Sequence, residues 1–196
     1  MSAIISSTAG NNALLTPVRL LYLHLMSFPT ATSALAAWIS AQGLGSDTIR
    51  AKVLGQAYCN DGATRKGGIA TRRVLLTCGP NVLSDATIVY RDYLLPADLR
   101  SQLRSTDLPF GEVVKSLGPS RRTTFASLTA APRTVISHDP VRPFTPILEL
   151  HATVTTADHG PIARVREVYG AYLLLNTSSM REHAHAMPRN GEVAET

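Results

Sequence analysis

The stretch Pro161-Ile-Ala-Arg-Val-Arg-Glu-Val-Tyr169 decides the predicted fold, because it reads as the second strand of a β-hairpin after the turn at 157–160. Side chains alternate along a strand. One face therefore carries a mostly apolar set: Pro161, Ala163, Val165, Glu167 and Tyr169. The other face carries Arg164 and Arg166, which we expect to point outward. A carboxylate aimed into a core is costly unless another group pairs with it or uses it, so Glu167 is the first candidate functional residue.

The same alternation predicts further strands on either side of this stretch. They cover residues 49–58, 70–77, 83–91, 123–129 and 147–156. In the first of these, Ile49, Ala51, Val53 and Ala57 form a half-buried core face. The turn at 79–81 joins 70–77 and 83–91 as an antiparallel hairpin. In the strand 147–156 the core face carries Leu148, Leu150, Ala152 and Val154.

Helices are predicted before and between the strands. Residues 13–27 form one helix with Pro17 in its first turn, and 32–42 form another that Gly43 and Gly45 end. A short helix follows Pro96, and a single helical turn covers 112–116. The predicted fold class is therefore α+β, with about six antiparallel strands.

Length and composition fit one domain over 1–196, with an ordered core at about 13–176 and a polar, flexible tail at 177–196. Four prolines make 130–146 an ordered loop or flap. No apolar run reaches the roughly 18 residues of a membrane span, and no secretory signal opens the chain, so we expect a cytoplasmic protein. Cys59 and Cys78 are predicted to be reduced thiols.

The net charge of +5 raises the question of an anionic partner. The arginines are scattered along the chain, and the few aromatic residues do not interleave with them. We therefore expect a small anionic ligand and no nucleic acid, with an ordinary solvated surface as the alternative. His183 and His185 have no acidic residue at metal-ligand spacing, so no metal site is predicted.

Two further features point to a polar pocket within the core. Arg72 shares a strand face with Ala70, Val74 and Leu76, which directs a guanidinium inward. It either binds a carboxylate of a ligand or pairs with Glu167. The segment Leu108-Pro-Phe-Gly111 precedes a helix start, where backbone amides favour anions and a glycine permits close approach. An ordinary helix cap is the alternative for this segment.

The order of these segments resembles the chorismate pyruvate-lyase family over roughly residues 14–175. The resemblance rests on Arg72-Arg-Val-Leu-Leu76, Leu108-Pro-Phe-Gly-Glu-Val-Val114, Gly160-Pro-Ile-Ala-Arg-Val-Arg-Glu167 and, more weakly, Thr30-Ala-Thr32. It implies a six-stranded antiparallel sheet with helices packed over an enclosed ligand site. It also implies a carbon–oxygen lyase that eliminates pyruvate from chorismate, leaves 4-hydroxybenzoate, and uses no metal or organic cofactor.

The resemblance assigns roles to individual residues. Glu167 and Arg72 would be catalytic, with Arg72 also holding the ring carboxylate. Ala31, Thr32, Phe110 and Gly111 would help to bind an anionic aromatic or pre-aromatic substrate. Arg166, Phe110 and Ala31 depart from the family pattern. These departures leave two alternatives open, which are a cyclase or isomerase acting on another ring or polyketide substrate and a small-ligand-binding module.

Overall fold

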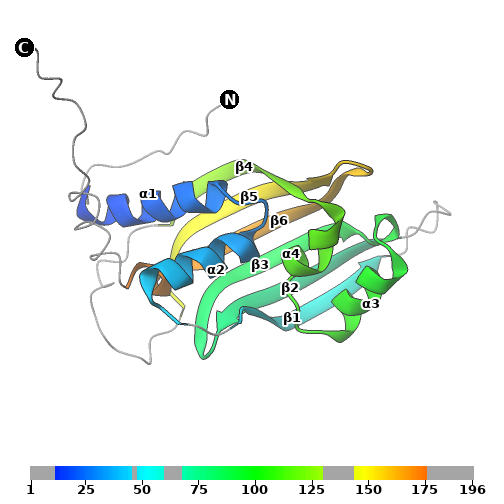
Figure 1. Cartoon of the computed structure of the whole chain (residues 1–196), viewed down its shortest axis with the longest axis horizontal. Coiled ribbons are helices and arrows are strands. Elements are labelled where there is room, and N and C mark those ends of the chain that lie inside the picture. The colour runs from blue at the N-terminus through cyan, green and yellow to red at the C-terminus, as the bar shows by residue number, and fades with distance from the viewer. Residues whose placement is uncertain (1–11, 46–47, 60–67, 130–143, 176–196) are drawn as a thin grey trace, which may run out of the picture.

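The computed structural model describes residues 12–45, 48–59, 68–129 and 144–175. In these ranges a six-stranded antiparallel sheet carries its helices on one face (Figure 1). The predicted α+β class and strand number are confirmed. The strands are β1 (Arg50–Cys59), β2 (Ile69–Cys78), β3 (Asn81–Arg91), β4 (Ser120–Leu128), β5 (Pro146–Thr156) and β6 (Gly160–Gly170).

The strands follow the order β1-β2-β3-β6-β5-β4 across the sheet. The two predicted hairpins, β2–β3 and β5–β6, are present, and pairing of β3 with β6 joins them at the centre. This pairing sets Glu167 opposite Ala86 on one side and Leu150 on the other. The inward side chains of the central strands are therefore the floor on which the helices pack.

The helices are α1 (Asn12–Met26), α2 (Ala31–Gln42), α3 (Ala97–Ser105) and α4 (Phe110–Val113), with 3₁₀ turns at Asp92–Leu94, Val114–Leu117 and Ala171–Leu174. Thr30 caps α2, since its side chain accepts a hydrogen bond from the Ser33 amide. Gly43 ends α2 in the left-handed conformation, as predicted. Because α1 begins at Asn12, Pro17 lies inside that helix and not in its first turn.

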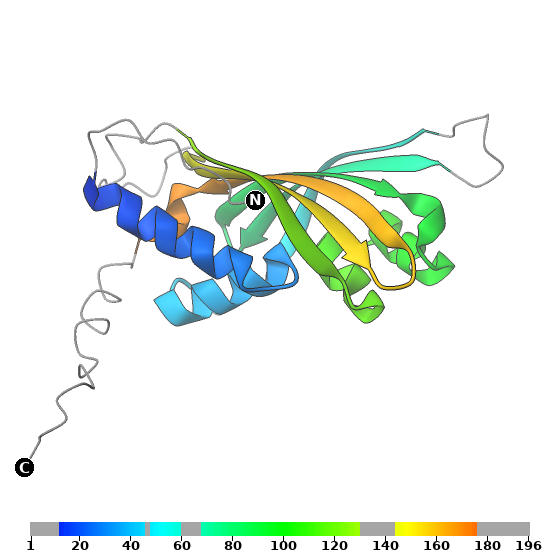
Figure 2. The same cartoon turned by 90° about the horizontal axis from the view of Figure 1, so that it is seen from above.

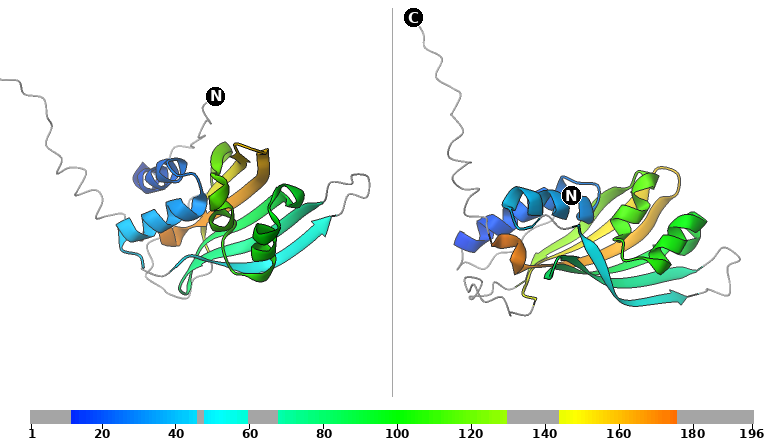
Figure 3. Two further views of the ribbon diagram at one scale, coloured as in Figure 1. Left: turned by 45° about the vertical axis from the view of Figure 1, so that its right-hand side comes forward. Right: turned by 60° about the horizontal axis from the view of Figure 1, so that its bottom comes forward.

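All four helices lie on the same side of the sheet, and the opposite face carries none of the described helices (Figure 2). The oblique views place α1 and α2 over one half of the sheet and α3 and α4 over the other (Figure 3). The core lies between the helices and the sheet, and Trp38, Tyr90 and Tyr169 are fully buried in it. Leu99 and Leu103 of α3 are buried there as well.

Strand β1 departs from its predicted pattern. Ile49 and Ala51 are buried, but Val53 is 41% exposed and Ala57 is exposed as well. The second half of β1 curves away from the helices together with β2 (Figure 2), and its register shifts between Val53 and Gly55. Because of this shift, Ala57 pairs with Thr71 and no longer shares a face with Ala51.

Several predicted segments lie outside the described residues. They are the N-terminal segment 1–11, the main part of the proline-rich stretch at 130–143, and the tail 177–196 with His183 and His185. Within the described part, no helix is long and apolar enough to cross a membrane. Cys59 and Cys78 lie at opposite ends of the β1–β2 ladder and do not form a disulfide with each other.

Candidate functional site

A small cavity of about 40 Å³ lies between the sheet and the starts of α2 and α4. Its sheet side is apolar and comes from β2, β3, β5 and β6: Val74, Leu76, Ala86, Ile88, Val154 and Val165. The helical side comes from residues 29–32 and 109–111 with Val114. Arg121 and Glu167 are the charged residues of the lining.

Arg121 and Glu167 form a buried ion pair across the inner face of the sheet. Their side chains are 2% and 7% exposed, and the Arg121 Nη2 donates to Glu167 Oε2. The Tyr169 hydroxyl donates to the same oxygen at 3.0 Å. Burial would lower the pKa of Arg121, but Glu167 and Tyr169 outweigh it and raise that pKa, so the guanidinium stays charged. Burial, followed by Glu167, holds the pKa of Tyr169 well above its ordinary value, so its hydroxyl stays a donor.

One nitrogen of the Arg121 side chain has no hydrogen-bond partner among the described residues. Arg121 Nη1 makes a long 3.5 Å hydrogen bond to the Leu25 carbonyl, and Nε is buried without a partner among the described residues. A buried donor without an acceptor is costly, and native proteins rarely keep one without a use or an unseen partner. Arg121, which lines the cavity, therefore keeps one buried donor that no described residue satisfies.

The sequence did not single out Arg121, and the reason lies in the boundary of its strand. The predicted strand begins at residue 123, whereas β4 begins at Ser120. In the longer strand Arg121 lies opposite the buried Val154, and Arg122 opposite Thr153. Extending the alternation three residues towards the N-terminus would have directed Arg121 inward.

Arg72 points inward as predicted, and it is 0% exposed. It does not pair with Glu167, so that predicted alternative is wrong. Its Nη1 donates to the Leu108 carbonyl at 3.0 Å, and its Nη2 donates to the Thr106 carbonyl at 2.9 Å. Burial lowers the pKa of Arg72. This side chain is outside the cavity lining and anchors the segment that leads into α4.

The structure places the other residues that were predicted to bind a ligand close together. Ala31, Thr32, Phe110 and Gly111 line the cavity beside Glu167. The close approach that Gly111 permits is to Thr30, because a Cβ at this position would lie 2.9 Å from the Thr30 Cβ. The α2 and α4 starts therefore touch each other above the cavity.

An outer groove of about 600 Å³ adjoins this contact. It runs between α2 and the start of β1, and its lining includes Ala36, Ile39, Ile49, Leu108 and Glu112. Thr32 and Pro109 line both the groove and the cavity. These two residues therefore lie where the outer groove meets the inner cavity.

Neither space has the ligands of a metal ion. Among the described residues no three His, Cys, Asp or Glu side chains gather closely enough to hold one. The donors beside the two spaces are the Arg121 Nε and the amides of Ala31 and Thr32, which helix geometry leaves without intrahelical acceptors. Such donors suit a carbonyl, carboxylate or hydroxyl oxygen.

No model of a known protein family matches the chain. The uncharacterized protein y4mC of Sinorhizobium fredii is 31% identical over 166 residues, which cover 74% of this chain and 70% of that protein. The chain belongs to the family of y4mC.

The solved structures that match this chain share less of its sequence than y4mC does. The effector domain of PhnF from Mycobacterium smegmatis has 16% identity and a TM-score of 0.44, covering 72% of this chain and 88% of that domain. A GntR-family transcriptional regulator from Enterococcus faecalis has 9% identity and a TM-score of 0.40, covering 61% and 92% of the two chains.

These findings correct the predicted identity. The similar solved structures named above are an effector domain and a transcriptional regulator, and the predicted membership of the chorismate pyruvate-lyase family is wrong. The predicted carbon–oxygen lyase, with chorismate as substrate and 4-hydroxybenzoate and pyruvate as products, falls with it. The geometry gives a physical reason why the two predicted catalytic residues do not serve that reaction. Arg72 already donates hydrogen bonds to two backbone carbonyls, and Glu167 already accepts hydrogen bonds from Arg121 and Tyr169.

Proposed function

We propose that this y4mC relative is a small-molecule-binding domain. Its ligand has an apolar, ring-sized body and one polar group that accepts a hydrogen bond, a carboxylate or a carbonyl. The observation that carries the proposal is the buried Arg121 Nε, which has no partner in the described part of the chain and belongs to a side chain that lines a largely apolar cavity. Apolar walls with a few convergent polar groups are typical of ligand sites. A cytoplasmic location, as predicted from the sequence, fits a metabolite as the ligand.

The sizes of the two spaces suggest how the ligand is divided between them. A cavity of about 40 Å³ has room for a polar group or a little water, but a benzene-sized body needs roughly 150 Å³. The outer groove of about 600 Å³ is large enough for that body. The polar group would pass between Thr32 and Pro109 to reach Arg121. Arg72 would act as a positioning residue, because it holds the segment before Pro109.

The charge on Glu167 decides between the two kinds of polar group. A ligand carboxylate next to Glu167 would put two acids beside one arginine, and such acids share a proton. Binding of a carboxylate would then take up a proton and tighten as the pH falls. A neutral amide analogue of the same ligand would show no such dependence.

The test is a screen of ring-bearing monocarboxylates and their amides, followed by amide chemical shifts and calorimetry. We expect the best ligand to raise the melting temperature and to shift the Ala31, Thr32 and Gly111 amides. Ala86→Val, which adds bulk to the cavity wall, should weaken binding by tenfold or more, an effect of about 1.4 kcal/mol. Arg122→Gln removes a neighbouring charge on the opposite face and is the matched control.

Two results would count against the proposal. One is a screen in which no compound shifts these three amides in folded protein. The other is a ligand whose affinity is the same in the Ala86→Val variant and in the parent chain, because that ligand would bind elsewhere.

A further inference from the structure

The sheet face that no described helix covers carries much of the positive charge of the chain. The alternation of buried and exposed positions directs Lys52, Arg73, Arg91, Arg122, Arg164 and Arg166 to it, together with Arg50, which pairs with Asp107. Asp85 and Glu149 are the acidic side chains on the same face. Each sequence pair of arginines is divided, with Arg72 and Arg121 inside and Arg73 and Arg122 outside. Charges that look scattered along the sequence therefore gather on one surface.

Three strands at one end of this surface form a compact outer patch. The register gives one row of Arg122, Thr153 and Arg164, and a neighbouring row of Phe125, His151 and Arg166. We call these six residues the outer patch. Strands lie about 4.8 Å apart, so the two arginines of the first row are based roughly 10 Å from each other. Phe125 is 44% exposed, and its ring lies 4.8 Å from that of His151.

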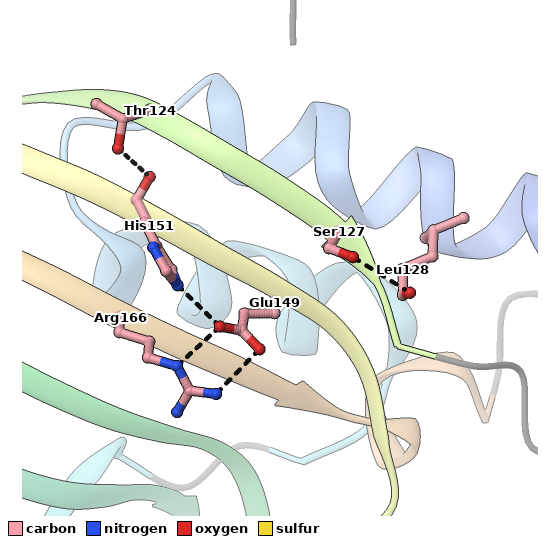
Figure 4. A network of polar contacts seen from close by, with 6 residues as sticks. All are labelled: Thr124, Ser127, Leu128, Glu149, His151 and Arg166. Carbon is pink, nitrogen blue, oxygen red and sulfur yellow. Dashed lines mark hydrogen bonds and ion pairs between the residues drawn. The ribbon is translucent and has the colours of Figure 1, made fainter. Parts of the chain in front are cut away.

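Hydrogen bonds hold the second row in place. Arg166 donates to both oxygens of Glu149, at 2.7 and 3.0 Å, and the His151 ring contacts the same carboxylate at 2.8 Å. These side chains lie on the side of the sheet away from α1 and α2 (Figure 4). Arg122 and Arg164 of the first row are exposed, and neither has an ion pair or side-chain hydrogen bond within the described ranges. The outer patch thus combines a fixed aromatic pair with two available guanidinium groups.

We propose that the outer patch binds single-stranded nucleic acid. Proteins that bind single strands without sequence preference combine arginines or lysines for the phosphates with aromatic rings on which bases stack. Arg122 and Arg164 suit successive phosphates, and the exposed face of Phe125 suits one base. An acidic protein segment would use the arginines but would leave the exposed aromatic pair without a role. The inference concerns the face opposite the ligand cavity and does not depend on it.

Fluorescence anisotropy on the full chain tests the proposal. The probes are labelled single-stranded DNA and RNA of about 16 nucleotides, the same DNA as a duplex, and polyglutamate. We expect both single strands to bind at low salt and to weaken steeply as salt increases. The double variant Arg122→Gln/Arg164→Gln should lower the salt slope by about 1 to 2. Phe125→Ser should weaken single-strand binding by about tenfold to a hundredfold.

The control double variant Arg19→Gln/Lys115→Gln removes the same charge from exposed positions on α1 and after α4. It should bind almost as well as the parent chain, and circular dichroism should show all variants folded. Equal losses in the two double variants would overturn the proposal, because binding would then follow net charge alone. It would also be overturned if no single strand binds, or if duplex or polyglutamate binds as tightly and Phe125→Ser changes nothing.

Discussion

At the scale of single residues, the buried Arg121–Glu167 pair determines what the core can do. A buried charge loses its hydration, and only a partner with good geometry compensates for that loss. Glu167 accepts hydrogen bonds from Arg121 and Tyr169, and these bonds compensate for the lost hydration of its carboxylate. The sequence indicated correctly that an inward acid at 167 needs a partner. It could not name the partner, because the two strands are separated by β5 and meet only in the folded sheet.

This pair gives a prediction on stability. Arg121→Met leaves Glu167 buried without its counter-charge and should lower the free energy of unfolding by about 3–5 kcal/mol. The double variant Arg121→Met/Glu167→Met should lose less than the single one, since no uncompensated charge remains. Urea unfolding of the parent, both single variants and the double variant measures the coupling. Additive losses would show that the two side chains do not act as a pair.

Tyr90 provides a prediction on pH. Burial, then the neighbouring Tyr58, raise its pKa to about 12. A tyrosine in the unfolded chain has a pKa of about 10, so the folded state favours the neutral phenol. The stability that follows is complete below pH 10 and is lost as the pH rises towards 12. Tyr90→Phe should therefore flatten the loss of melting temperature in this range, whereas Tyr93→Phe, at a 39% exposed position, should retain it. Parallel curves for Tyr90→Phe and the parent would contradict the argument.

At the scale of elements, the contact between the starts of α2 and α4 forms the helical side of the cavity. Gly111 meets Thr30 there, and Arg72 fixes the carbonyls of Thr106 and Leu108 just before α4. The helix α4 spans four residues, too few to be stable alone. Its position therefore depends on these contacts and not on helix propensity.

Gly111→Ala tests this dependence. The added methyl would lie 2.9 Å from the Thr30 Cβ, so α4 or α2 must shift. Overpacking of this kind costs about 1–3 kcal/mol. Gly55→Ala is the control, because a Cβ at Gly55 has no neighbour within 4 Å. Denaturant midpoints of the two variants give the comparison, and equal midpoints would mean that the contact is loose.

The sequence predicts the strands at the centre of the sheet more accurately than the strands at its edges. Strands β2, β3, β5 and β6 follow the predicted alternation closely because helices cover one of their faces. The edge strands are where the predictions departed, in the exposed half of β1 and in the early start of β4. An edge strand has one neighbouring strand and is only partly covered by helices. The polarity of its side chains therefore indicates less clearly which of them face the core.

At the scale of the whole molecule, the one-sided arrangement of helices gives the sheet two different faces. The inner face holds Arg72, Arg121 and Glu167 in a nearly apolar core, while the outer face holds the remaining arginines of the same strands. The sequence contains the alternation that divides them. It does not contain the strand order, so it could not show that Arg122 and Arg164 lie in one row.

The strand order also predicts which backbone amides exchange slowly with solvent and which exchange fast. The central strands β3 and β6 are paired on both sides, so their amides should exchange with solvent only when the whole domain unfolds. The second half of β1 has one paired neighbour and mostly exposed residues, so residues 54–59 should exchange through local fraying. Hydrogen exchange followed by mass spectrometry should therefore show the slowest exchange at 84–90 and 163–169 and a much faster rate at 54–59. A ligand bound in the cavity should slow exchange at 30–34 and 109–114 and leave 54–59 unchanged, which separates ligand binding from a general gain in stability. Equal protection in β1 and β3 would mean that another surface covers β1 in solution.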